Sequence, residues 1–395
     1  MTTPTVDRRQ LLGLAAASAL PLVFPRALLA AGGDPRRALV VVQLSGGNDG
    51  LSTVVPFGDD AYGRARTALR VAEPLKLDEH VGLHPNLDRW LPLFREGRLA
   101  IVQGASYPEP NRSHFKALDI WHTADARGRS LDTGWLGRAI DRECGERPDP
   151  NLVVQVGKGA TYALAARRHK PVAFENADAY RWQGRPGDER AFDGCNGACG
   201  EGSDVQRWLH DMAIAARSSS AQVRAVVSRY RPKAEYPKSR LAGDLHTVAA
   251  LLDGGLGTRV AYVDRGGFDT HSRQKDGHDQ LMREIGDALA AFQADVAAHG
   301  HADRVLTIVF SEFGRRVVEN ASGGTDHGVA GPMFLLGNPV KGGLHGTHPS
   351  LTDLDEGDLQ MTTDFRSVYA AVLQRWLEAP AAAVLGREYP RLAVL

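Results

Sequence analysis

The chain has 395 residues, of which 43% are hydrophobic and 24% charged, and its 47 Lys and Arg balance 47 Asp and Glu. This composition is ordinary for a globular protein and excludes fibrous and disordered classes. A net charge of zero lacks the basic excess of nucleic-acid-binding proteins, so we expect no nucleic-acid partner. The length admits one large α/β domain with insertions or two ordinary domains.

The N-terminus has the pattern of an export signal. An arginine pair at 8–9 precedes an apolar stretch over 11–24, and small residues follow at 29–31. The apolar stretch is interrupted by proline and falls short of the roughly 20 residues that span a bilayer. We therefore predict that residues 1–33 are a twin-arginine signal peptide, with an uncleaved amphipathic anchor as the alternative. The mature chain would then be periplasmic or secreted, without a transmembrane segment, and the twin-arginine translocase would be its partner during export.

Short apolar runs recur along the mature chain, and they are typical of buried strands. These runs cover residues 38–44, 99–103, 152–156, 260–263, 305–310 and 333–336. Apolar residues at helical spacing occupy 278–299 and 364–377. Alternation of strands and helices predicts an α/β fold with a mostly parallel central sheet sandwiched by helices.

The strand pattern stops between about residues 175 and 238, where polar, Gly-rich and Arg-rich sequence takes over. A helix is predicted there over 205–230. We interpret this stretch as an inserted cap, so that residues 34–395 form one α/β domain with an insertion.

Three cysteines occur, and two of them, Cys195 and Cys199, lie four positions apart. They close a small disulfide loop or remain two free thiols, and the sequence leaves both alternatives open. Cys144 has no obvious partner. No paired CxxC repeat is present, so we assign no zinc ribbon and no redox motif.

Polar residues follow the ends of the predicted strands, where parallel sheets bind their ligands. Asp49, Asp269, Glu312 and Asp326 all lie in such loops. Several carboxylates gathered in one desolvated site cannot all stay ionised without a compensating positive charge. Divalent metal ions supply that charge, and two of them suit a mixed Asp, His and Ser set. Arginines are the alternative source of the compensating charge, namely Arg112, Arg315 or Arg316.

Several candidate residues also have ordinary structural interpretations. Ser113 begins a predicted helix, where a hydroxyl near a metal becomes a usable nucleophile, but serine is also a favoured N-cap. Asp49 is equally well an ordinary turn aspartate. His327 is equally well a surface histidine, and His114 is expected to pack or orient rather than to ligate.

The motifs resemble those of one family of exported bacterial proteins, the domain-of-unknown-function 1501 family. The resemblance covers nearly all the mature chain and rests on the twin-arginine start and on residues 44–50, 112–115, 267–271, 311–315, 325–328 and 364–369. That family is itself similar to the alkaline phosphatase and sulfatase superfamily. The resemblance implies parallel strands, a metal-binding aspartate after the first strand, a nucleophile at a helix start, and later Asp and His ligands.

Carried onto this sequence, the resemblance implies a metal-dependent hydrolase of a phosphate or sulfate ester, with a small molecule or saccharide as the alcohol. Ser113 would be the nucleophile, Arg112 would bind an ester oxygen, and His114 would stand beside them. One or two zinc, manganese or calcium ions would be held by a set that comprises Asp49, Ser113, Asp269, His271, Glu312, Asp326 and His327.

The sequence departs from the superfamily pattern in two places. Glu312 stands where aspartate is common, and Phe313 stands where a histidine ligand is common. These departures favour the alternative that the chain is a non-catalytic binding or assembly protein of the cell envelope. A serine esterase is disfavoured, because no Gly-x-Ser-x-Gly elbow occurs near Ser113. A formylglycine mechanism is disfavoured as well, since its signature is missing there.

Overall fold

The computed structural model describes residues 37–127, 131–143, 149–185, 187–197 and 203–395. The predicted signal peptide lies outside these residues, as do Cys144 and Cys199, so the Cys195–Cys199 alternatives stay open. Cys195 is exposed. Within the described residues, no helix combines the length and the apolar character needed to cross a membrane.

A nine-stranded sheet forms the centre of the fold, in the order β11-β5-β10-β9-β1-β8-β6-β7, with β14 also paired to β5. Its strands are β1 (Ala38–Leu44), β5 (Leu99–Ser106), β6 (Val153–Val156), β7 (Val172–Phe174), β8 (Val260–Arg265), β9 (Val305–Phe310), β10 (Gly331–Leu336), β11 (Gly343–His345) and β14 (Thr363–Asp364). All pairings are parallel except those of β10, which runs antiparallel to β9 and β5. The predicted mostly parallel sheet is confirmed.

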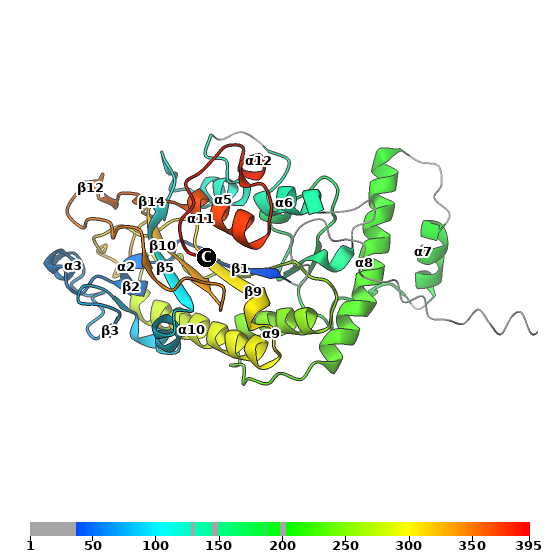
Figure 1. Ribbon diagram of the computed structural model, residues 1–395, viewed down its shortest axis with the longest axis horizontal. Helices are drawn as coiled ribbons and strands as arrows, with labels where there is room; N and C mark the ends of the chain where they lie inside the picture. Colours follow the sequence, from blue (N-terminus) through cyan, green and yellow to red (C-terminus); the bar gives the residue numbers. More distant parts are fainter. Residues whose placement is uncertain (1–36, 128–130, 144–148, 186, 198–202) are drawn as a thin grey trace, which may run out of the picture. The chain divides into compact units, whose positions relative to one another are not determined.

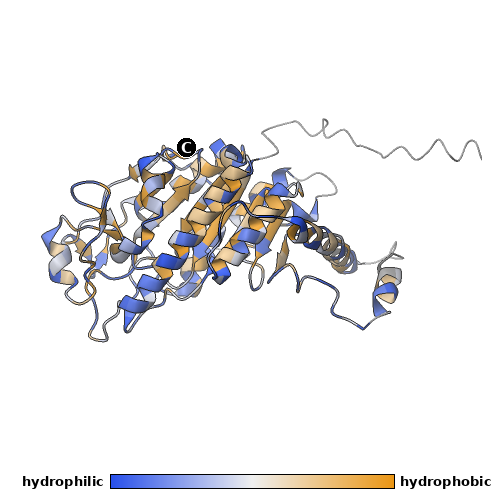
Figure 2. Ribbon diagram, turned by 90° about the horizontal axis from the view of Figure 1, so that it is seen from below, coloured by the Kyte–Doolittle hydropathy of each residue, from blue (hydrophilic) through white to orange (hydrophobic). Residues whose placement is uncertain are grey.

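Both faces of the sheet are buried, which explains why its strands are continuous apolar runs. Val40 and Val42 of β1 belong to one hydrophobic cluster, and Leu39 and Val41 belong to another on the opposite face. The first face is covered by α4 (Trp90–Arg95), α9 (Arg240–Asp253) and α10 (Gln274–Ala298). The second is covered by α5 (His114–Thr123), α6 (Trp135–Glu143) and α11 (Phe365–Ala371). The two helical layers enclose the sheet in Figure 1, and apolar residues concentrate on the strands and inner helix faces in Figure 2.

The structure refines the predicted helix boundaries. Helix α10 begins four residues earlier than its apolar spacing predicts, because its first amide, that of Gln274, donates to the carbonyl of Gly323. The helix predicted over 364–377 is α11 followed by a π-helical turn, η6 (Val372–Trp376). Asp364 caps α11 by accepting from the amide of Arg366.

The segment predicted to be an insertion contains α7 (Asp188–Gly197) and α8 (Asp204–Arg229). Ser203 and Gln206 form a capping box at the start of α8, a motif that satisfies two amides of the first turn. Whether this segment acts as a cap stays a prediction.

The remaining elements are short and lie in the connections. They are α2 (Gly50–Thr53), β2 (Val54–Val55), α3 (Asp60–Ala65), β3 (Leu75–Lys76), β4 (Gly82–Leu83), η2 (Pro85–Leu87), η3 (Pro150–Leu152), η4 (Tyr162–Leu164), η5 (Ala302–Arg304), β12 (Leu354–Asp355), β13 (Asp358–Leu359) and α12 (Ala381–Leu385). Strands β2, β4 and β3 form a small sheet, and β12 pairs with β13.

Candidate metal centre

The loops after β1, β8 and β9 meet at the carboxyl end of the central sheet. The loop after β1 can approach the loop after β8 only because Gly46 has no side chain. Its φ is +122°, and a Cβ there would come within 2.4 Å of the amide nitrogen of Asp269. Glycine is the residue that tolerates both this backbone conformation and such an approach.

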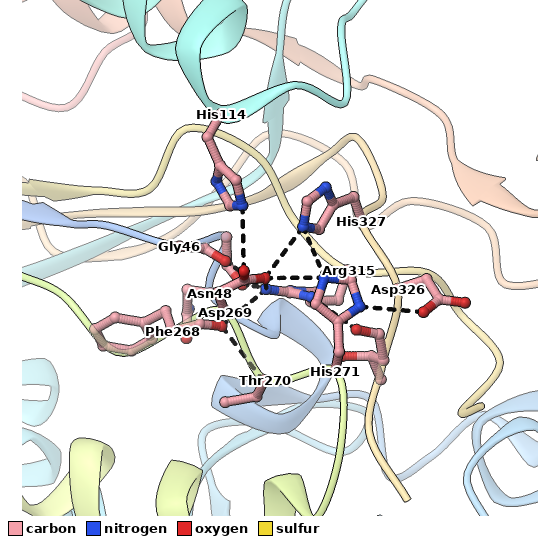
Figure 3. Close-up of polar contacts among 12 residues, drawn as sticks. Gly46, Asn48, His114, Phe268, Asp269, Thr270, His271, Arg315, Asp326 and His327 are labelled. Atoms are coloured by element: carbon pink, nitrogen blue, oxygen red, sulfur yellow. Dashed lines mark hydrogen bonds and ion pairs between the residues drawn. The ribbon is translucent and has the colours of Figure 1, made fainter. Parts of the chain in front are cut away.

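Three histidines and one aspartate converge at this edge of the sheet (Figure 3). His114, Asp269 and His327 each offer one ligand atom, and these atoms lie within 4.8 Å of one another. The Nε2 of His271 lies 2.9 Å from the Nε2 of His327 and 3.0 Å from Oδ1 of Asp269. We call these four residues the His/Asp centre. They come from the start of α5, the loop after β8 and the loop between β9 and β10.

The outward nitrogen of each histidine in the centre contacts an oxygen atom. The three Nδ1–oxygen distances are 2.8 Å from His114 to Oε1 of Glu312, 2.8 Å from His327 to the carbonyl of Arg112, and 3.2 Å from His271 to Oδ1 of Asp326. Carboxylate and carbonyl oxygens accept, so each Nδ1 carries the proton and donates it. Each Nε2 is then left with a lone pair that faces the centre, which is how metal-bound histidines are arranged in proteins.

One nitrogen in the centre makes no hydrogen bond with any described residue. The Nε2 of His114 is buried, and Oδ2 of Asp269 lies 3.6 Å away, beyond hydrogen-bond distance. A buried polar atom without a hydrogen bond is uncommon and calls for an explanation. A divalent cation supplies one, because three imidazoles and a carboxylate are a usual ligand set for zinc. The residues present therefore fit a metal ion.

Asp269 is the acid of the centre. Partial burial acts to raise the pKa of its carboxyl, but the hydrogen bond and the charge of Arg315 outweigh burial and lower that pKa to about 2. The Nη2 of Arg315 lies 2.7 Å from Oδ1 of Asp269. The arginine that neutralises Asp269 is thus one of the three that the sequence offers. It is fully buried and held by the carbonyls of Gly47 and Thr325.

Glu312 does not face the centre. It is buried, it accepts hydrogen bonds from the amide of Gly46 and the hydroxyl of Ser311, and its one ion-pair partner among the described residues is His114. Asp326 contacts the outer nitrogen of His271 and the side-chain amide of Asn320. Both acids thus contact the outer nitrogen of a histidine, and their expected role as metal ligands stays a prediction. His114, expected to pack or orient, presents its Nε2 to the centre.

Asp49 lies apart from the His/Asp centre, in a buried ion pair. Its Oδ2 and Oδ1 lie 2.6 and 3.0 Å from Nη1 and Nη2 of Arg66, and Ser52 and Gln274 also donate to Oδ2. Burial acts to raise the pKa of the Asp49 carboxyl, but the charge and hydrogen bonds of Arg66 hold it well below its usual value. The cation opposite Asp49 is therefore an arginine of the chain itself.

The sequence analysis missed Arg66 and Gln274. Arg66 is the C-cap of α3 and is fully buried, with Nε donating to the carbonyl of Val317. Arginine is almost never fully buried unless it is paired. Nothing local in the sequence distinguishes Arg66 from its exposed neighbour Arg64.

Ser113 and Arg112 stand at the start of α5. Ser113 is the N-cap residue, but its side chain caps no amide, and it is exposed. Arg112 is paired with Asp358, its Nε lying 2.7 Å from Oδ2 of that residue. Their predicted roles as nucleophile, metal ligand and ester-binding residue stay predictions.

The family model described as "Protein of unknown function (DUF1501)" matches residues 101–385, and the chain belongs to this family. No curated protein matches the sequence.

Solved structures with similar folds have low identity to the chain. An alkaline phosphatase superfamily protein from Vibrio parahaemolyticus is 10% identical with a TM-score of 0.39, over 97% of this chain and 78% of that one. The C-terminal periplasmic domain of EcEptC from Escherichia coli, a complex with Zn, is 10% identical with a TM-score of 0.38, over 76% and 72%. Alkaline phosphatase from the Antarctic bacterium TAB5 is 12% identical with a TM-score of 0.32, over 77% and 92%. What this protein binds or converts therefore has to be inferred from its own side chains.

Proposed function

We propose that this member of the family is a metal-dependent hydrolase of a phosphate or sulfate ester, with its metal held by the His/Asp centre. The observation that carries the proposal is the orientation of three imidazoles, each with Nδ1 on an oxygen acceptor and Nε2 turned inward. A structural role alone does not require three Nε2 lone pairs to face one another and a carboxylate. A cation between them relieves that repulsion.

The ligand set favours zinc among the three candidate metals. Imidazole nitrogens suit zinc, whereas calcium prefers oxygen ligands and manganese prefers carboxylate, carbonyl and water oxygens. A zinc ion bound here supplies Lewis-acid stabilisation of the charge that develops on the ester oxygens.

We assign the attack on the ester to Ser113. Its Oγ makes no hydrogen bond with a described residue, and it stands one position before His114 at the start of α5. The positive end of the helix dipole favours the developing alkoxide. The Oγ forms a bond to phosphorus or sulfur while the bond to the alcohol oxygen breaks, and the alcohol leaves with the serine proton. Water then cleaves the seryl ester and restores the hydroxyl.

One observation favours the alternative of a non-catalytic binding protein. Asp49, which the family resemblance implies as a metal ligand, is already neutralised by Arg66. A centre limited to the remaining ligands is consistent with a binding protein that retains one metal. Export by the twin-arginine route to the periplasm or the medium also remains our proposal, based on residues 1–33.

Metal analysis of purified protein tests the proposal. We expect the wild type to hold about one zinc per chain, and His114→Ala and His327→Ala to lose it, because each removes an inward Nε2. His80→Ala is the matched control, since His80 is exposed and lies outside the centre. Ser113→Ala should keep the metal and lose turnover of phosphate and sulfate esters.

Three results separate the alternatives. A folded wild type that binds no divalent metal would contradict the metal centre. Metal binding without turnover of any ester in the wild type would favour the binding protein. Full turnover by Ser113→Ala would remove the nucleophile assignment while leaving the metal centre intact.

A further inference from the structure

A second site lies beside the first turns of α10. A cavity of about 270 Å³ opens there, and none of its lining residues belongs to the His/Asp centre. Three segments line it, namely residues 69–73, residues 84–86 and the start of α10 from Gln274 to Asp279, together with Ser52. Small-molecule sites are concave, and a few placed polar groups fix the orientation of the ligand.

The charged groups of the cavity leave one cation without a partner. Both oxygens of Asp279 have partners. The Nε2 of His84 lies 2.9 Å from Oδ1, and the Nζ of Lys275, which supplies the neutralising charge, lies 2.9 Å from Oδ2. Arg70 lines the same cavity, is exposed, and forms no hydrogen bond or ion pair with any residue that the structure describes. Glu73, the other acid in the lining, is exposed as well. An unpaired guanidinium beside a cavity is a fork of donors that matches phosphate or carboxylate oxygens.

The N-terminus of α10 adds a second source of positive potential. The helix is 25 residues long, its N-cap Arg273 has φ of +45°, and no side chain caps its first turn. The amide of Gln274 already donates to the carbonyl of Gly323, so the amides that follow it in the first turn are the ones that favour an anion. Gln274 and Lys275, the first two residues of the helix, line the cavity.

His278 lies at the cavity wall. Whereas Arg70 and the amides of α10 are hydrogen-bond donors, His278 supplies a hydrogen-bond acceptor. It is only 2% exposed, and its Nε2 lies 3.2 Å from Oδ1 of Asn48. Because that amide oxygen accepts, Nε2 carries the proton, and Nδ1 is left as a lone pair. Nδ1 forms no hydrogen bond with the described residues. Burial lowers the pKa of His278 to about 4, so its ring stays neutral near pH 7.

We propose that this cavity binds free hydrogen phosphate. Arg70 and the start of α10 bind the phosphate oxygens, and Nδ1 of His278 accepts the proton of a P–OH group. Sulfate and acetate carry no such proton at neutral pH, so the same lone pair faces their unprotonated oxygens and repels them. The site therefore selects phosphate over sulfate.

Calorimetric titrations of the full chain with inorganic phosphate, glycerol 3-phosphate and sulfate test this proposal. They are carried out on the wild type and on His271→Ala, which removes an inward ligand of the His/Asp centre. Phosphate binding to both proteins is the expected result. Sulfate should bind at least about tenfold more weakly, because it leaves the lone pair of His278 unsatisfied.

Arg70→Ala should weaken phosphate binding by about tenfold or more, as expected for the loss of charged hydrogen bonds. Arg64→Ala is the matched control, since Arg64 is an exposed arginine outside the cavity lining, and it should bind phosphate as the wild type does. Glycerol 3-phosphate should bind more weakly than phosphate, because the second pKa of a phosphate monoester is about 6 and most of it carries no P–OH group at neutral pH. Binding of glycerol 3-phosphate as tight as that of phosphate would contradict the role of His278.

Several results would overturn the proposal. These are the absence of phosphate binding, equal binding of sulfate, or unchanged affinity in Arg70→Ala. Binding to the wild type but not to His271→Ala would place the phosphate at the His/Asp centre instead. The proposal does not depend on the hydrolase, because the His271→Ala protein tests the cavity without the complete centre.

Discussion

Asp49 and Asp269 follow neighbouring parallel strands, β1 and β8, yet their surroundings differ. Asp49 is fully buried and shares both carboxylate oxygens with Arg66. The side chain of Asp269 is 49% exposed, and its Oδ1 lies close to Arg315 and two histidines. Position at a strand end therefore does not decide whether an aspartate is available to a metal. An aspartate is closed to a metal when an arginine of the chain binds both of its oxygens, as at Asp49. It is open to a metal when histidine Nε2 lone pairs lie beside it, as at Asp269.

The largest effect is expected from Arg66→Ala. Removing one partner of a buried ion pair leaves an uncompensated charge, so we expect a loss of about 3–5 kcal/mol in the free energy of unfolding. Urea denaturation measures the loss, and Arg64→Ala, at an exposed position in the preceding turn, should change stability by less than about 0.5 kcal/mol. A loss below about 1 kcal/mol for Arg66→Ala would contradict the inference that Arg66 neutralises Asp49 while Asp269 remains available to a metal.

The buried surroundings of Asp49 include His278, and this histidine should make the free energy of unfolding depend on pH. Burial lowers the pKa of His278 to about 4, from the 6.5 that is ordinary for histidine. As pH falls below 6.5, His278 is protonated in the unfolded chain but stays neutral in the folded chain. The free energy of unfolding therefore falls with pH until about pH 4, where the folded chain is protonated as well. A fully buried histidine with this difference costs roughly 3 kcal/mol over that range.

Denaturation at a series of pH values measures this dependence. Burial lowers the pKa of His122 and His169 in the same way, so the slope of the wild type alone does not isolate one residue. His278→Gln should flatten the slope between pH 6.5 and 4 relative to the wild type. An unchanged slope would show that His278 is not held neutral by the fold.

A smaller effect, on metal affinity, is expected at the His/Asp centre from Glu312→Gln. The carboxylate of Glu312 contacts Nδ1 of His114, and loss of such an outer contact lowers metal affinity by about 10–100-fold. Competition with a zinc chelator measures the affinity. Glu388→Gln, at an exposed residue far along the chain, is the matched control and should leave the affinity unchanged. An unchanged affinity in Glu312→Gln would mean that His114 needs no acid to orient it.

Local patterns in the sequence were enough to locate the main strands and helices and the end of the sheet where the candidate residues lie. Apolar runs located β1 and β9 with their observed bounds, and helical spacing located α10 to within four residues at its start. These signals are local, because burial on both faces of a sheet or along one face of a helix leaves a repeating pattern. Asp269, His271 and His327 could be predicted because they directly follow strands or lie in glycine-rich loops beyond them.

Which residues face the centre depends instead on contacts between distant parts of the chain. Arg66 reaches Asp49 from the end of α3, and Glu312 reaches His114 across 198 positions of sequence. The contacts of Nδ1 determine which ring nitrogen of each histidine points inward, and its acceptors come from distant loops. Residue type and spacing therefore indicate that a histidine lies near the site. The atoms that each ring nitrogen contacts decide whether that histidine can bind a metal or only orients a neighbouring residue.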